Sequence, residues 1–221
     1  MALTLYYHPF SSFCQKVLIA LYEGGIAFEP HLVDLGDAES RAAFEQLWPL
    51  AKFPVLRDEG SGLVLPESSV IIDYLAQRFP AAASLIPAEP EAALRARMLD
   101  RIFDGYVSMQ LTKVVIDALR PDGGKDPIGV EQAKATIATA YDWLDRELPE
   151  GGWAVGEGFT LADCSAAPAL FYANIAVPFA GHPRLEAYYA RLRARPSFDR
   201  AVEEARPYRP IFPLGWPADY E

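Results

Sequence analysis

Four consecutive residues near the N-terminus, Ser11-Ser12-Phe13-Cys14, place hydroxyls and a thiol between a predicted strand and the start of a predicted helix. The free N–H groups and the dipole of such a helix start favour a thiolate or a carboxylate. A dithiol redox enzyme carries cysteine at both ends of this C-x-x-C spacing, whereas here Ser11 takes the first place. A serine hydroxyl cannot form a mixed disulfide, but it can donate a hydrogen bond that stabilises a nearby thiolate. The segment therefore predicts either thiolate activation by Ser11 or a plain helix N-cap, and the motif alone does not separate the two.

The pair Phe53-Pro54 lies between a loop and a predicted strand. A cis bond at this proline would turn the backbone N–H and C=O of Phe53 toward the helix start, where they could pair with an extended peptide. The alternative is an ordinary trans-proline that begins an edge strand, and on the pair alone this alternative is favoured.

The pair Glu67-Ser68 follows the last predicted strand and opens another predicted helix. Ser68 is predicted to be the N-cap, with the next N–H groups free to bind an anion. Glu67 can accept from an ammonium group, so the pair matches the carboxylate and amine of a γ-glutamyl group. A capped helix without a ligand is the alternative.

The elements that position these residues form a βαβ–α–ββα order in residues 1–80. Strand, helix and strand at the start predict a parallel pair joined by a right-handed crossover, and Glu59-Gly60-Ser61-Gly62 predicts a hairpin. This is the order of an α/β thioredoxin-like domain. Residues 81–90 are rich in alanine and proline and are predicted to be a linker. Residues 91–221 show only helical patterns, which predicts an all-α domain with an extended C-terminal tail.

Composition excludes several classes of partner. The 221 residues carry a net charge of −10, which argues against a nucleic-acid groove or an anionic membrane surface. No apolar run approaches the length of a membrane span. No Cys/His cluster has metal-ligand spacing, so no metal is expected. Two distant cysteines, Cys14 and Cys164, fit a reducing compartment, and we expect a cytoplasmic protein.

Taken together, the motifs Ser11-x-x-Cys14, Phe53-Pro54-Val55-Leu56 and the segment 66–75 resemble the glutathione site of the Ser/Cys-type cytosolic glutathione transferases. The resemblance implies that Pro54 is cis, that Phe53 pairs its backbone with the cysteinyl part of glutathione, and that Lys52 reaches the glycyl carboxylate. It also implies that Glu67 and Ser68 bind the γ-glutamyl end. Alignment on Val17 places Ser11 at the catalytic position, with Ser12 as its competitor.

The helical part supports this resemblance. Gly158-Phe159-Thr160-Leu161-Ala162-Asp163 predicts a capping box with Thr160 as N-cap and resembles the buried capping box of the family. Asp163 is therefore expected to serve folding rather than catalysis. The first long helix would supply the second-substrate pocket, although an apolar helix stripe is more often core or dimer interface. Its candidates are Phe103, Tyr106, Met109, Gln110 and Lys113, with Asp100 and Asp104 near the γ-glutamyl amine or simply solvated.

The resulting hypothesis is a glutathione transferase that stabilises the glutathione thiolate and conjugates it to a small apolar electrophile, or uses it to isomerise or dehalogenate one. Glutathione is the expected co-substrate, and the resemblance implies a homodimer and a role in detoxification. A glutathione-dependent thiol reductase is one alternative, which Ser11 disfavours because such relatives carry cysteine there. A non-catalytic glutathione-transferase-like binding protein is the other, which the joint presence of Ser11, Lys52, Pro54, Glu67 and Ser68 disfavours. The sequence does not identify the electrophile.

Overall fold

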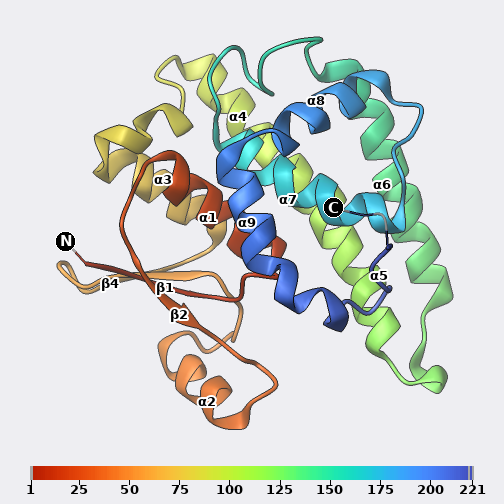
Figure 1. Cartoon of the computed structure of the whole chain (residues 1–221), viewed down its shortest axis with the longest axis horizontal. Coiled ribbons are helices and arrows are strands. Elements are labelled where there is room, and N and C mark those ends of the chain that lie inside the picture. The colour runs from red at the N-terminus through yellow and green to blue at the C-terminus, as the bar shows by residue number, and fades with distance from the viewer. Residues whose placement is uncertain (1, 219, 221) are drawn as a thin grey trace.

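The N-terminal part of the molecule is built on a four-stranded mixed sheet, seen in a computed structural model that describes residues 2–218 and 220 (Figure 1). The strand order is β2-β1-β3-β4, with β1 and β2 parallel and the other two pairs antiparallel. The predicted parallel pair and hairpin are therefore confirmed. The strands are β1 (Leu3–Tyr7), β2 (Glu29–Leu32), β3 (Val55–Asp58) and β4 (Leu63–Pro66).

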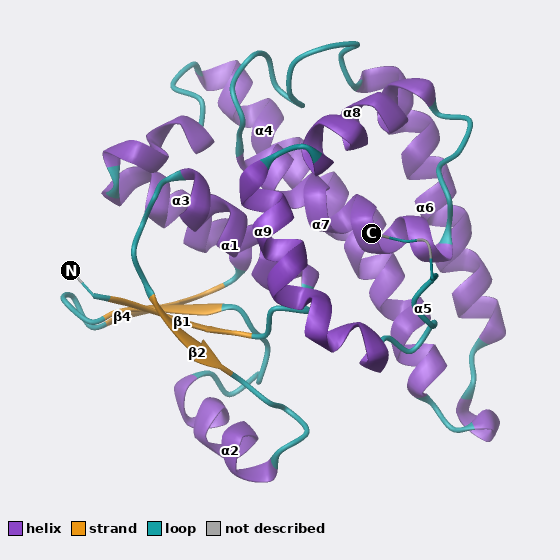
Figure 2. Cartoon of the chain, viewed as in Figure 1, coloured by secondary structure: helices purple, strands orange, loops and turns teal. Residues whose placement is uncertain are grey.

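Three helices complete this part. Helices α1 (Ser12–Glu23) and α3 (Ser68–Arg78) lie on the side of the sheet that faces the helical part, and α2 (Ala38–Leu47) lies on the other side (Figure 2). Helix α1 is buried from Cys14 to Leu21 because it packs against the sheet layer and against two helices of the second half. This position makes α1 the shared wall of the two halves.

Among the described residues, the helical part contains one long interrupted helix, four further α-helices and short 3-10 helices. The predicted first helix is continuous in space but changes pitch, since α4 (Pro90–Ile102) runs into a π-helix, η2 (Phe103–Ser108), and then into α5 (Met109–Leu119). Isolated π-helical turns inside α-helices often mark functional sites. The remaining helices are α6 (Pro127–Glu147), α7 (Leu161–Ala176), α8 (Pro183–Arg193) and α9 (Pro196–Ala205).

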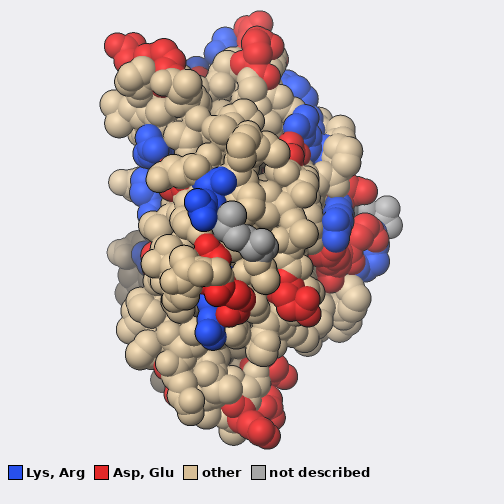
Figure 3. Space-filling model, turned by 90° about the vertical axis from the view of Figure 1, so that its left-hand side faces the viewer, with Lys and Arg blue, Asp and Glu red and all other residues tan. Residues whose placement is uncertain are grey.

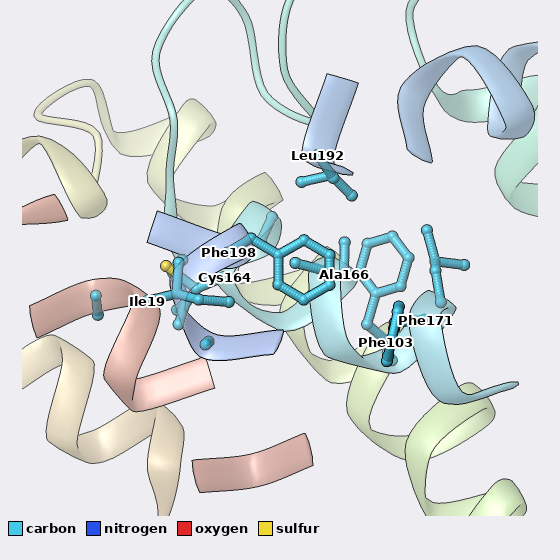
Figure 4. Packing of buried hydrophobic residues seen from close by; sticks show 14 of the residues in the cluster. Ile19, Phe103, Cys164, Ala166, Phe171, Leu192 and Phe198 are labelled. Atoms are coloured by element: carbon cyan, nitrogen blue, oxygen red, sulfur yellow. The ribbon is translucent and has the colours of Figure 1, made fainter. Parts of the chain in front are cut away.

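The core runs through both halves around α7, which is almost entirely buried. Figure 4 shows Phe171 and Phe198 of α7 and α9 meeting near Leu192, with Ile19 of α1 and Cys164 on the neighbouring side. The segment predicted as a linker contains a 3-10 helix, η1 (Pro80–Leu85), that packs on α3, and the tail begins with another, η4 (Arg206–Ile211). The division into domains at residues 80 and 91 stays a prediction.

Two further features concern the charges on the surface and the lengths of the apolar helices. Acidic and basic side chains are interspersed on the face in Figure 3, with acidic groups gathered toward its top and bottom. Within the described residues, none of the helices is both long and apolar enough to cross a membrane.

Candidate functional site

Two adjoining cavities lie where α1, the loop before β3 and the long interrupted helix meet. They share four wall residues: Phe13, Lys52, Phe53 and Met109. The first, the polar cavity, has a volume of about 440 Å³. The second, the apolar cavity, has a volume of about 580 Å³. The other residues that line the polar cavity are Pro54, Glu67, Ser68, Arg101, Asp104 and Gly105.

The backbone beside both cavities has an unusual conformation in two places, the loop before β3 and the turn after β4. The Phe53–Pro54 peptide is cis, as the resemblance implied. Ala51 and Glu67 have φ angles of 47° and 72°, a left-handed conformation that costs energy for residues other than glycine. Such backbone strain clusters at ligand sites, and Ala51 lines the apolar cavity while Glu67 lines the polar one.

The start of α3 differs from the prediction by one residue. Helix α3 begins at Ser68, so that Glu67 rather than Ser68 is the N-cap, and no side chain caps this end. The reason is the left-handed φ of Glu67, which turns the chain one residue earlier than a serine cap would. The first N–H groups of α3 have no partner within the helix, which suits this end of the cavity to an anionic group.

A buried charge network backs the polar cavity. The ammonium of Lys16, 1% exposed, lies 2.5 Å from Asp100 and 2.8 Å from both Asp104 and the Ser69 hydroxyl. Arg101 pairs with Asp104 from the solvent side. Burial raises the pKa of the Asp104 carboxyl, although Lys16 acts to lower it. The network ties α1 and α3 to the long helix directly behind the predicted γ-glutamyl end.

Sequence reasoning missed Lys16 and Arg101 as parts of this site. A signal for Lys16 existed: it is a lone cation at the start of the apolar run Val17 to Leu21. A lysine there is buried only if it is paired, and Asp100 and Asp104 are one helical turn apart.

At the other end of the site, Ser11 is the N-cap of α1, and its Oγ accepts from the Cys14 N–H at 3.4 Å. An accepting hydroxyl keeps its own hydrogen to donate, so the cap and a bond to a thiolate are compatible. Ser12 is the first residue of α1, and both serines line the apolar cavity. Cys14 is fully buried, and burial raises the pKa of its thiol to about 12.

Of the five side chains predicted for a second substrate, only Met109 lines the apolar cavity; Gln110 lines neither cavity, and its Nε2 donates to the Gly105 carbonyl at 2.9 Å. Met109 lines both cavities. Phe103 is fully buried in the core, Tyr106 lines a separate hollow beside Trp143, and Lys113 lines another beside Asp117. Leu111, Thr112 and Val115 of α5 line the apolar cavity instead, and they follow the π-helical turn, which shifts the register of later residues relative to a regular α-helix.

The tail forms part of the apolar cavity, which the sequence did not reveal. Phe212 and its neighbours Ile211 and Pro213 line the cavity. Phe212 contacts Phe10 with ring centroids 5.8 Å apart, and Trp216 lies 6.0 Å from Phe10. The tail was predicted to be extended; it begins with the 3-10 helix η4 and then packs on the loop that precedes Ser11.

The capping box of α7 has the predicted structural role. Asp163 accepts from the Thr160 N–H at 2.8 Å, from Ala154 N–H at 2.9 Å and from the Tyr188 hydroxyl at 2.6 Å. It lies in the core and lines neither cavity. Among the described residues, no group of three or more His, Cys, Asp or Glu is arranged to hold a metal ion.

The chain is similar in sequence and in structure to known proteins. Residues 5–83 match the model of a glutathione S-transferase N-terminal domain, and residues 127–191 match that of the C-terminal domain. The chain is 30% identical to glutathione S-transferase theta-1 of Rattus norvegicus over 92% of this chain and 87% of that protein. It is also 30% identical to a stringent starvation protein A homolog of Coxiella burnetii, covering 92% of each. A crystal structure of a glutathione S-transferase from Methylobacillus flagellatus with glutathione bound superposes with a TM-score of 0.81 at 30% identity, covering 90% of this chain and 98% of that one.

Proposed function

Because the chain belongs to the glutathione S-transferase family, we propose that it binds glutathione in the polar cavity and transfers it to an electrophile held in the apolar cavity. The observation that carries this proposal is the shared wall of the two cavities. A peptide that pairs with the Phe53 backbone places its cysteinyl sulfur at this wall, and Ser11 lies on the apolar side of it. Proximity of the sulfur and the electrophile then lowers the barrier.

Each part of glutathione meets matching chemistry in this arrangement. Lys52, at the junction of the cavities, pairs with the glycyl carboxylate. The γ-glutamyl carboxylate takes the free N–H groups at Ser68, and the γ-glutamyl ammonium pairs with Glu67. Lys16 and Arg101 balance Asp100 and Asp104, so the carboxylate of Glu67 is the one left for the ligand cation.

Ser11 activates the thiol in this proposal. Its hydroxyl donates to the sulfur and the N-terminus of α1 adds a favourable field, so the thiol loses its proton to solvent near neutral pH. The thiolate then forms a bond to an electrophilic carbon, which either expels a leaving group such as halide or passes its electron pair to a conjugated acceptor. Lys52 is the single charged residue among those lining the apolar cavity, which favours neutral, apolar electrophiles.

The thiol-reductase alternative is less well supported. It requires a reactive cysteine, whereas Cys14 is fully buried and the pKa of its thiol is raised to about 12. A simple binding experiment distinguishes the proposed function from that of a non-catalytic glutathione-transferase-like binding protein. Retention of the protein on immobilised glutathione, with release by free glutathione, supports the proposal, and failure to bind favours an interaction protein.

We also propose a cytoplasmic homodimer. Exposed apolar side chains on α3 and along the long helix support the dimer: Val70, Leu94, Met98 and Tyr106 are 40% to 70% exposed. Sedimentation velocity measures whether the protein is a dimer in solution.

A panel of electrophiles that includes an aryl halide, a maleyl compound and a peroxide identifies the reaction. We expect the aryl halide to be conjugated best.

A further inference from the structure

The loop that carries Ser11 is fixed by a small set of hydrogen bonds. The Ser11 N–H donates to the His8 carbonyl at 3.0 Å, and the Phe10 N–H donates to His8 Nδ1 at 3.2 Å. Gln15, in the first turn of α1, holds the loop twice. Its backbone N–H donates to the Ser11 carbonyl at 2.9 Å, and its side-chain Nε2 donates to the Pro9 carbonyl at 2.9 Å.

The same amide nitrogen reaches across to the helical part. Gln15 Nε2 donates to the hydroxyl of Tyr172, on α7, at 2.8 Å. A carbonyl such as that of Pro9 can only accept, so the amide nitrogen must face it, and the amide cannot be flipped. Both side-chain N–H groups of Gln15 are therefore used, one on the loop and one on Tyr172.

This arrangement leaves a polar atom unsatisfied. Gln15 is fully buried, and its Oε1 has no hydrogen-bond partner among the described residues. An unpaired buried acceptor costs stability, and an apolar side chain would avoid that cost. Sites that break the packing rules in this way are often functional.

Tyr172 also belongs to the electrophile side. It lines the apolar cavity, and its ring lies 5.4 Å from that of Phe10 and 6.1 Å from that of Phe212. One side chain thus touches the cavity wall, the serine loop and the tail, while its hydroxyl is tied to the residue that fixes the loop.

Resting on the function proposed above, we propose that Gln15 and Tyr172 form a positioning pair that holds the Ser11 loop in the geometry that activates the thiol. The hydroxyl of Tyr172 keeps the Gln15 amide in place, and the amide keeps the Pro9 carbonyl in place, two residues before Ser11. Neither residue binds glutathione, because neither lines the polar cavity. The pair therefore acts on the pKa of the bound thiol and on kcat, and leaves the affinity for the protonated thiol form of glutathione unchanged.

The test is Tyr172→Phe, which removes one oxygen and keeps the ring in the cavity wall. We expect kcat for an aryl halide to fall about tenfold and the pKa of the bound thiol to rise by about one pH unit, since one buried N–H loses its partner. The dissociation constant for glutathione, measured by calorimetry at a pH below the pKa of the bound thiol, should stay at the wild-type value, since the shift in this pKa alters the apparent affinity only at higher pH. The thiol pKa is read from the ultraviolet absorbance of the thiolate against pH.

Tyr141→Phe is the matched control, because Tyr141 is equally buried and its hydroxyl has no hydrogen-bond partner among the described residues. It should leave both the thiol pKa and kcat unchanged. Gln15→Leu should reproduce the loss seen in Tyr172→Phe, and the double variant should be no worse than Gln15→Leu alone, because the two act as one unit.

The proposal is overturned if Tyr172→Phe matches Tyr141→Phe, if it weakens glutathione binding as much as it lowers kcat, or if the losses of the two single variants add. If Gln15→Leu does not fold, the first two outcomes still decide. Absence of a thiolate signal in the wild-type protein would instead contradict the proposed function itself.

Discussion

The polar and apolar cavities share a wall but are built in different ways. The polar cavity relies on backbone conformation and charge: a cis peptide, a left-handed Glu67 at the start of α3, and a buried lysine behind two aspartates. The apolar cavity relies on side-chain shape contributed by α5, α7 and the tail. The difference implies that the first is specific for one ligand and sensitive to small changes, whereas the second is tolerant and adjustable.

The largest expected effect is on the buried charge behind the polar cavity. Lys16→Met leaves Asp100 and Asp104 buried without their ammonium partner, which should lower the free energy of unfolding by about 3–5 kcal/mol. Urea denaturation measures this. Lys134→Met is the control, because within the described part of the chain Lys134 pairs only with exposed Glu131, at 3.5 Å, and its loss should change stability by less than about 0.5 kcal/mol. Equal effects of the two would show that the network is not a rigid base for the cavity.

The next effect concerns ligand recognition in the polar cavity. Glu67→Gln removes the negative charge left for the γ-glutamyl ammonium, and glutathione affinity should fall about thirtyfold. Calorimetry gives the affinity, and kcat at saturating glutathione should remain close to the wild-type value. Glu91→Gln, at an exposed position on α4, should bind normally. Unchanged binding in Glu67→Gln would remove Glu67 from the site.

A change in the apolar cavity should lower kcat/KM for the electrophile without changing the affinity for glutathione. Val115→Phe fills part of this cavity, so kcat/KM for the bulkiest electrophile that the protein accepts should fall about tenfold. Glutathione affinity should not change. Ile128→Phe, at a position 72% exposed on α6, is the control. Loss of glutathione binding in Val115→Phe would mean that the two cavities are not separable.

The smallest expected effect is at Cys14. Burial raises the pKa of its thiol to about 12, so Cys14 stays a protonated, unreactive thiol at pH 8. Iodoacetamide should therefore leave Cys14 unmodified in the folded protein and modify it in urea, as mass spectrometry of the peptides would show. Fast alkylation of the native protein would revive the thiol-reductase alternative.

The same contrast explains what could be predicted from the sequence. Phe53-Pro54, Glu67 and the Thr160–Asp163 capping box are contiguous motifs at the ends of elements, so local rules and the family resemblance locate them. Tyr172 and Phe212 reach the Ser11 loop from far along the chain, and their placement depends on how α7 and the tail pack.

The orientation of side chains on the long helix was a second feature that the sequence did not predict. The long helix was predicted as regular, whereas residues 103–108 form a π-helix; Phe103, Tyr106 and Lys113 lie outside the apolar cavity and Met109 lines it. No residue pattern in that segment signals the change of pitch. The N-cap of α3 lies one residue earlier than predicted for a similar reason: nothing in the residue type of a glutamate predicts its left-handed φ.

In the proposed function, Ser11 lines the apolar cavity beside the shared wall and holds glutathione as a thiolate. The most direct measurement is the ultraviolet difference spectrum of the protein with and without glutathione at pH 7, for the wild type, Ser11→Ala and Ser12→Ala. We expect a thiolate signal in the wild type and in Ser12→Ala, and its loss in Ser11→Ala with glutathione still bound. A signal that survives in Ser11→Ala and disappears in Ser12→Ala would contradict the assignment.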